Sequence, residues 1–168
     1  MKKALIGFMP FALWLAISAA AYAANAETSY KVYLNARFGY SVEYPDIFDT
    51  QNEPDNGDGI MFESADGEYS LTIGGGHNVL EWDGEALLNM CKERVAHIVE
   101  GSEKTGKGFY SIEYSDDGGQ NGVEHIFHEY GLVNAELTTS FILKYPKEEE
   151  ERFTEIKKRL EASFKIKE

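Results

Sequence analysis

One stretch of the sequence resembles a nucleotide-binding motif. Residues 101–107 fit Gly-x-x-x-x-Gly-Lys, the pattern of a phosphate-binding loop. That loop continues with Ser or Thr, whose hydroxyl holds magnesium, but here Gly108 follows. The loop must also lead from a strand into a helix N-terminus, whereas we expect a helix before this segment and a strand after it. The motif therefore does not predict nucleotide binding.

Two further groups contain residue types that bind metals. His125 and His128 lie three positions apart in an expected strand, where side chains alternate between faces. They cannot share one ion without a bulge, and we expect one on the sheet surface and the other partly packed. In the acidic loop 53–59, calcium-loop offsets counted from Asp55 place glycines at the third and fifth positions. We therefore predict no metal and no cofactor.

The best candidate for a contact site follows a run of three glycines. We expect Gly74–Gly76 to end a strand and to let a ligand, or only a neighbouring element, approach the backbone closely. His77 and Asn78 are polar side chains on the loop that leads to Trp82 and a helix. We take His77, Asn78 and Trp82 as candidate ligand-binding residues, and a purely structural role is the alternative.

Signatures of nucleophilic catalysis are missing from the sequence. It has neither a Gly-x-Ser-x-Gly elbow nor a Cys-x-x-Cys pair. Paired carboxylates carry little information in so acidic a chain. No catalytic residue is predicted, although a hydrolase site assembled from distant carboxylates and histidines stays an open alternative.

The elements that would position these residues follow from periodicity and turn chemistry. Alternating apolar residues predict strands, and Asp66-Gly67 is typical of a tight hairpin turn. Asp83 can cap a helix whose apolar stripe reaches Val99, and a last helix after Pro146 carries a stripe from Phe153 to Phe164. The expected strands are 30–34, 40–44, 60–64, 68–73, 109–114, 123–130 and 135–145, with helices at 84–100 and after 146. This order lacks a βαβ rhythm, so we predict an α+β fold, an α/β/α sandwich with a largely antiparallel sheet.

The N-terminus has the pattern of a signal peptide. Two lysines precede a run from Ala4 to Ala24 without charged residues, and Ala21-Tyr22-Ala23 is a small-x-small cleavage pattern. We predict a signal peptide at 1–23 and a single exported domain at 24–168, periplasmic or secreted. Cleavage after Ala26 and retention as a membrane anchor are the alternatives. The only cysteine, Cys91, is far from the cleavage site, so no lipid anchor is predicted.

Charge limits the partners of the exported domain. Without its leader the chain has 14 Lys and Arg against 29 Asp and Glu, a net charge of −15. Such a charge disfavours nucleic acid and anionic membrane surfaces as partners. A single cysteine forms no disulfide within the chain, and its place on the helical stripe favours a buried, inert thiol over pairing with another chain.

Three stretches resemble a known family. Phe38–Pro45 resembles the opening of small exported α/β/α sandwich domains, and Tyr145-Pro146 before the last helix is similar. Asn56–Gly59 with Leu71–Asn78 resembles a group of uncharacterised secreted bacterial proteins. The order of elements is similar to that of PsbP, of DcrB-like lipoproteins and of a nuclear-import factor that binds the Ran GTPase. The resemblance implies the sandwich fold and a role as binding or assembly partner, but no functional residue matches a known site motif.

The sequence therefore predicts an exported, non-catalytic binding or assembly-accessory module with an unknown protein partner. A small-ligand-binding protein with a cleft near His77 is the first alternative, and the hydrolase is the second. Each predicts a different feature: an exposed apolar patch, a concave pocket with polar groups, or a buried cluster of titratable groups.

Overall fold

The computed structural model describes residues 28–116, 118 and 122–167. The expected signal peptide and the start of the exported domain, residues 1–27, lie outside the described residues. The strands are β1 (Tyr30–Leu34), β2 (Tyr40–Pro45), β3 (Thr50–Asn52), β4 (Gly59–Glu63), β5 (Ser70–His77), β6 (Lys104–Gly106), β7 (Phe109–Ser115), β8 (His125–Val133), β9 (Leu137–Pro146) and β10 (Lys165–Ile166). The helices are α2 (Gly84–Arg94), the 3₁₀ turn η2 (Lys147–Glu149) and α3 (Glu150–Ser163).

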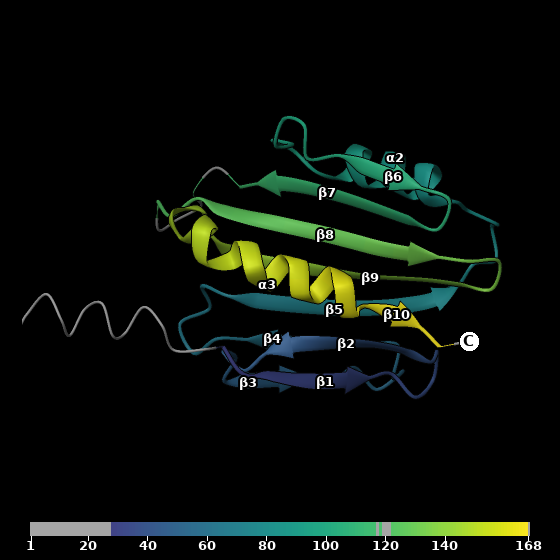
Figure 1. Cartoon of the computed structure of the whole chain (residues 1–168), viewed down its shortest axis with the longest axis horizontal. Coiled ribbons are helices and arrows are strands. Elements are labelled where there is room, and N and C mark those ends of the chain that lie inside the picture. The colour runs from purple at the N-terminus through teal and green to yellow at the C-terminus, as the bar shows by residue number, and fades with distance from the viewer. Residues whose placement is uncertain (1–27, 117, 119–121, 168) are drawn as a thin grey trace, which may run out of the picture.

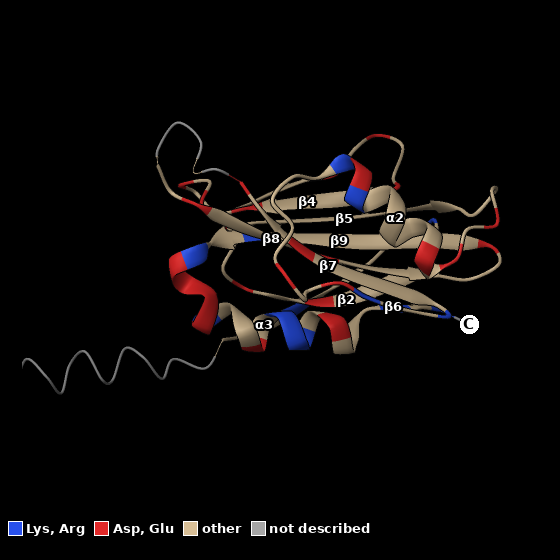
Figure 2. Ribbon diagram, turned by 90° about the horizontal axis from the view of Figure 1, so that it is seen from above, with Lys and Arg blue, Asp and Glu red and all other residues tan. Residues whose placement is uncertain are grey.

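These elements form three layers, and the middle layer is an antiparallel sheet (Figure 1). The central sheet has seven strands in the order β3-β4-β5-β9-β8-β7-β6. α3 and a small sheet of order β1-β2-β10 cover one face, and α2 covers the other (Figure 2). The predicted α+β fold, an α/β/α sandwich with a largely antiparallel sheet, is therefore confirmed. Within the described residues, no helix is long and apolar enough to cross a membrane.

The larger core lies between the central sheet and the layer of α3 and the small sheet. Its fully buried aromatic side chains include Tyr40, Phe141, Tyr145 and Phe153. α3 buries Phe153, Ile156 and Leu160 of the predicted stripe, because these residues recur at helical spacing. The last stripe residue, Phe164, is buried too, but it follows the helix in extended conformation. A smaller core under α2 contains Leu88, Cys91, Tyr110 and Ile112.

Turn and cap chemistry explains the elements that the sequence predicted well. β4 and β5 are joined through Asp66-Gly67, where Gly67 adopts φ +74° and Asp66 accepts a 2.6 Å hydrogen bond from the Ser64 hydroxyl. Asp83 caps α2 by accepting a hydrogen bond from the backbone of Ala86. The short strands β3, β6 and β10 were not predicted, since two or three residues carry no readable period.

The first helix is shorter than predicted. It ends at Arg94 instead of Glu100, and Val95 is already extended. Beyond it the chain turns at His97, with φ +51°, and runs along β7, where the Val99 N–H donates to the Glu113 carbonyl. These backbone groups find partners on a strand edge, which competes with continuing the helix.

The glycine run also differs from the prediction. Gly74–Gly76 do not end a strand, because β5 continues through them to His77. A Cβ on Gly75 would lie 2.7 Å from Cε1 of Tyr40. The group that approaches the backbone closely at Gly75 is therefore the Tyr40 ring from the small sheet.

Candidate functional site

The three predicted contact residues lie around the end of β5. His77 is exposed, and its ring stands edge-on to Phe38 with 5.3 Å between ring centroids. Asn78 is buried, and its amide donates to the carbonyls of Trp82 (2.9 Å) and Asn134 (2.8 Å). Its side-chain oxygen accepts from the Trp82 N–H (2.9 Å). Asn78 thus fastens the loop before α2 to the β8–β9 turn.

Asn78 and Trp82 share an open pocket, which His77 does not line. The pocket has a volume of about 700 Å³ and also includes Lys107, Val133 and Asn134. Both hydrogens of the Asn78 amide are already bonded to backbone carbonyls. Recognition of a ligand there would therefore depend on Trp82, Lys107 and the backbone more than on Asn78.

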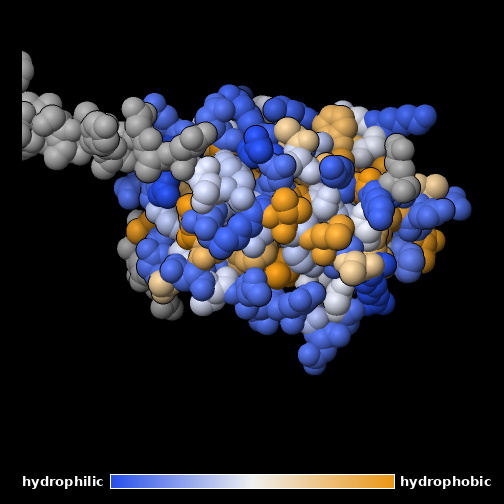
Figure 3. Space-filling model, turned by 60° about the horizontal axis from the view of Figure 1, so that its bottom comes forward, coloured by the Kyte–Doolittle hydropathy of each residue, from blue (hydrophilic) through white to orange (hydrophobic). Residues whose placement is uncertain are grey.

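The most exposed apolar residues in a strand lie on β1. Val32 is 68% exposed and Leu34 is 60% exposed, while Tyr33 between them points inward and meets Phe62 edge-on. Within the described residues, β1 is an edge strand of the small sheet and pairs with β2 alone. Figure 3, in which the lower side of Figure 1 comes forward, shows apolar side chains at the surface among hydrophilic ones. We call the side of the small sheet that carries Tyr30, Val32 and Leu34 its outer face.

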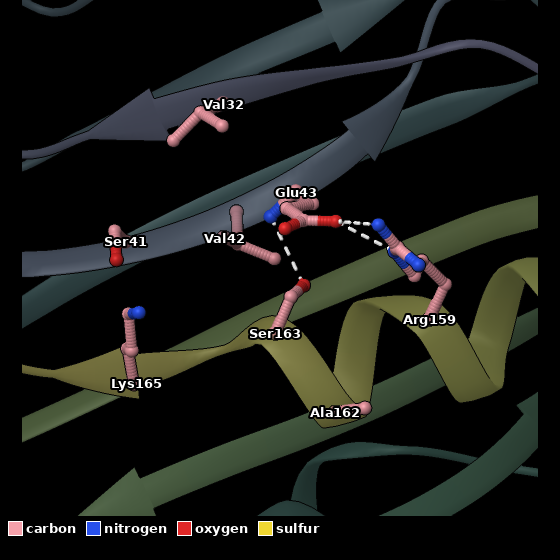
Figure 4. A pocket seen from close by; sticks show the side chains of 8 residues that line it. All are labelled: Val32, Ser41, Val42, Glu43, Arg159, Ala162, Ser163 and Lys165. Carbon is pink, nitrogen blue, oxygen red and sulfur yellow. Dashed lines mark hydrogen bonds and ion pairs between the residues drawn. The ribbon is translucent and has the colours of Figure 1, made fainter.

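A groove of about 410 Å³ runs beside this face, between β2 and the end of α3 (Figure 4). Val32, Val42 and Ala162 supply its apolar walls. At one end Glu43 is paired with Arg159 at 2.5 Å, and the Glu43 N–H donates to the Ser163 hydroxyl at 3.0 Å. At the other end stands Lys165, which pairs in register with Ser41.

The outer face carries ion pairs and two further lysines beside its apolar side chains. Glu43 is paired with Arg159, and Glu155 on the neighbouring helix is paired with Lys158. Lys165 and Lys167 form no ion pair within the described residues. The face therefore combines apolar side chains with two lysines that have no ion-pair partner among the described residues.

A partly buried cluster of charged residues holds α3 on the central sheet. His128 contacts Glu113 through Nδ1 (3.1 Å) and Glu161 through Nε2 (2.9 Å), and the Lys157 ammonium donates to Glu113 (2.7 Å). Burial opposes charge on Glu113, but hydrogen bonds from His128 and Lys157 outweigh it and lower its pKa to about 2. Burial likewise lowers the pKa of His128, yet the two carboxylates raise it overall.

The arrangement of this cluster does not resemble a poised catalytic base. Nδ1 of His128 faces Glu113, whereas Nε2 lies 2.9 Å from Glu161 but makes no hydrogen bond among the described residues. The pKa shifts of Glu113 and His128 both favour the charged forms, as expected of an ion-pair network. The cluster is thus the buried titratable group that a hydrolase would need, but its geometry supports fastening α3 instead.

The two histidines of β8 point to opposite faces, as predicted, but both are buried. His125 lies between Glu68 (Nε2, 2.9 Å) and Asp116 (Nδ1, 3.2 Å), and His128 belongs to the cluster under α3. The expectation of one histidine on the sheet surface was therefore wrong, because acidic side chains cover His125. In the part of the chain that the structure describes, no three His, Cys, Asp or Glu residues form a metal site.

On the α2 side, a second polar group surrounds the cysteine. Glu129 is buried and accepts hydrogen bonds from Arg94 (2.7 Å) and from the Tyr110 hydroxyl (2.8 Å). Cys91 Sγ lies 3.3 Å from the same carboxylate. Burial and the adjacent Glu129 raise the pKa of the Cys91 thiol to about 12. The burial predicted for Cys91 is confirmed.

Comparison with known proteins identifies the fold. No protein-family model matches the chain, and no curated protein matches its sequence. Among solved structures, cyanobacterial PsbP (CyanoP) of Synechocystis matches 85% of this chain and 95% of its own, with a TM-score of 0.60 and 12% identity. The yeast Ran-binding protein Mog1p matches 83% and 96%, with a TM-score of 0.53 and 8% identity.

LpqN of Mycobacterium tuberculosis, described as involved in cell envelope biogenesis, also matches. It covers 89% of this chain and 96% of its own, with a TM-score of 0.50 and 14% identity. At such identities the likeness concerns the fold alone. The chain has a PsbP-like fold, which confirms the fold that the resemblance in the sequence implied.

Proposed function

We propose that this protein is an exported, non-catalytic binding or assembly-accessory module that contacts a protein partner through the outer face of the small sheet. The observation that carries the proposal is the exposure of Val32 and Leu34 on a regular strand beside an open groove. Large apolar side chains gathered at a surface mark interaction sites in soluble proteins.

The fold neighbours support the same class of function. Mog1p is a Ran-binding protein, and LpqN is involved in cell envelope biogenesis. Their partners differ, so the fold suggests a binding role without naming a partner. Export rests on the pattern of residues 1–23, and a periplasmic or secreted location is part of the proposal.

A capture experiment tests the proposed surface. The chain from Ala24 to Glu168 would carry biotin on an Asn89→Cys substitution, because α2 lies on the opposite side of the central sheet and Cys91 is buried. This bait would be incubated with the periplasmic extract of its source. We expect one stoichiometric partner, which the double substitution Val32→Glu and Leu34→Glu removes.

A matched control distinguishes the surface from general stickiness. Val79 (81% exposed) and Leu80 (64% exposed) form a second exposed apolar pair, on the loop before α2. The substitutions Val79→Glu and Leu80→Glu should leave capture unchanged. Equal loss with both double variants, or no captured partner, would contradict the proposed surface.

The pocket at Trp82 supports a second candidate function, the binding of a small ligand. Its volume of about 700 Å³ lies within the range of ligand sites. Trp82 is the only tryptophan of the chain after residue 23, so its fluorescence reports on this pocket selectively. A compound that changes this fluorescence and raises Tm in the wild type, but does not raise Tm in Trp82→Phe, would favour this candidate.

A further inference from the structure

Asn56 and Gly57 form an Asn-Gly pair in a surface turn of the acidic loop 53–59. Asn56 is exposed, Gly57 adopts φ +64°, and the Gly57 N–H donates to the Pro54 carbonyl at 2.9 Å. In such a pair the glycine nitrogen can attack Cγ of the asparagine side chain and close a five-membered ring. Glycine hinders this attack least, because it has no side chain. The groups around this turn therefore decide how readily the ring forms.

Arg37 is placed to make the glycine nitrogen more nucleophilic. Its guanidinium donates to the carbonyl oxygen of Asn56 and lies over the Phe38 ring, with 4.8 Å from the guanidinium carbon to the ring centroid. This oxygen belongs to the same peptide group as the Gly57 nitrogen. When the nitrogen loses its proton, resonance puts much of the negative charge on the oxygen. A charge-assisted hydrogen bond to the oxygen stabilises that anion, so Arg37 raises the population of reactive nitrogen.

Asp58 fixes and activates the asparagine side chain. The Asn56 amide group donates to the Asp58 carboxylate at 2.6 Å, which holds the side chain along its own backbone. The Asp58 N–H donates to Oδ1 of Asn56 at 3.4 Å. During attack at Cγ, negative charge develops on Oδ1, and a donor that is already in place stabilises it. Nucleophile, electrophile and both donors therefore belong to this turn and to Arg37.

We propose that Asn56-Gly57 is a self-modification site, at which Arg37 and Asp58 promote the deamidation of Asn56. The Gly57 nitrogen gives its proton to solvent and forms a bond to Cγ of Asn56, the Cγ–Nδ2 bond breaks, and ammonia leaves with a proton from solvent. Water then opens the cyclic imide at either carbonyl. One opening yields aspartate, and the other yields iso-aspartate, in which the main chain runs through the side-chain carbons. Either product adds one negative charge to the loop.

The iso-aspartate loosens the attachment of the small sheet to the central sheet. Beside the site, the Gly57 carbonyl accepts a hydrogen bond from the buried Asn35 amide at 3.0 Å. The Asp58 carbonyl accepts from the Tyr40 hydroxyl at 2.6 Å and from the Gly75 N–H at 3.0 Å. Tyr40 belongs to β2 and Gly75 to β5, so the loop joins the two sheets. An extra main-chain carbon just before Gly57 shifts these carbonyls away from their partners.

Peptide mapping by mass spectrometry measures the reaction in the domain 24–168 incubated at pH 8. It separates Asn56 from the second Asn-Gly pair of the sequence, residues 121–122. We expect Arg37→Gln to slow the deamidation of Asn56 at least fivefold, because the cation is lost. Arg37→Lys, the matched control, keeps a cationic donor and should change the rate less than threefold. In concentrated urea, which removes the contacts of the turn, the three proteins should react at the same rate.

Two results would overturn the role of the turn. One is an equal rate for wild type and Arg37→Gln in the folded state, and the other is a folded rate at least tenfold below the rate in urea.

Amide exchange tests the effect of the modification on the two sheets. The purified iso-aspartyl form is compared with Asn56→Asp, which carries the same charge on an unaltered main chain. We expect the Gly75 amide to exchange at least tenfold faster than in the wild type in the iso-aspartyl form, and less than threefold faster in Asn56→Asp. Equal exchange in both would contradict the loosening of the small sheet. The proposal goes beyond the proposed function and does not depend on it, because partner capture is measured separately.

Discussion

Replacing His128 by Gln tests how α3 is held on the central sheet. The imidazole is buried between Glu113 of β7 and Glu161 of α3, and Phe141 of β9 lies beside its ring. Glutamine is similar in size and polar but carries no charge. The two carboxylates would lose their shared cation, although Lys157 would still compensate Glu113.

The expected loss follows from the cost of breaking a buried ion pair. Removing one partner of such a pair costs about 3–5 kcal/mol. Because Lys157 remains beside Glu113, we expect a smaller loss, about 2–3 kcal/mol in the free energy of unfolding at pH 5.5. With a typical dependence on urea, this lowers the unfolding midpoint by roughly 1–2 M.

The raised pKa of His128 predicts in which direction the difference in stability between the two proteins changes with pH. The pKa of His128 is raised in the folded protein, because the carboxylates outweigh the opposing effect of burial. A group with a raised folded pKa stabilises fully below its unfolded pKa of about 6.5, and this stabilisation is lost as pH rises through the folded pKa. The difference between wild type and His128→Gln should therefore be largest at pH 5.5 and should shrink by pH 9.

Urea titrations of both proteins across pH 5.5–9 measure this difference directly. Contributions from other groups largely cancel, since both proteins share them. His77→Gln is the matched control, because His77 is exposed and contacts no carboxylate among the ion pairs of the described residues. A difference that stays constant or grows toward pH 9 would refute the role assigned to the protonated His128.

Three further predictions concern positions away from this cluster. Asn78→Ala should lower the free energy of unfolding by about 2–3 kcal/mol, because three backbone groups lose their partner; an unchanged urea midpoint would contradict this. Gly75→Ala should cost about 1–3 kcal/mol through the Tyr40 ring, while Gly76→Ala, with open space at its Cβ, should cost nothing measurable in the same titration. Cys91 should react with a thiol reagent at pH 8 only when urea unfolds the protein, because its pKa is about 12; rapid reaction of the folded protein would show that the thiol is accessible.

The parts of the fold that the sequence predicts are those in which local chemistry and tertiary packing agree. Asp66-Gly67 closes a hairpin by itself, and the stripe of α3 fits only a helix. The helix expected at 84–100 shows the limit. Val95, Ile98 and Val99 continue its apolar spacing, yet an extended segment along β7 buries them partly as well. Spacing alone does not distinguish these two ways of burying the same side chains.

The candidate site depended more on distant contacts than on motifs. Asn78 appeared in the sequence as a polar loop residue, but its amide bonds to Asn134, 56 positions along the chain. Similarly, His128 and Glu161 meet only because α3 crosses β8. A single sequence holds no signal for such contacts between residues that are distant along the chain, so the charged cluster under α3 was not predicted.

The outer face of the small sheet shows why a correct strand prediction can still hide a binding site. Alternation of Tyr30, Val32 and Leu34 predicts a strand, and the simplest expectation is that this apolar set faces the core. In the structure Tyr33 takes the core side, because it packs on Tyr40 and Phe62, which leaves Val32 and Leu34 at the surface. Besides Tyr33, the core side of β1 carries Lys31, which is paired with Asp46, so the apolar pattern alone favours the wrong face. An exposed apolar face gains nothing for the isolated fold, and this is our reason for assigning the outer face to a protein partner.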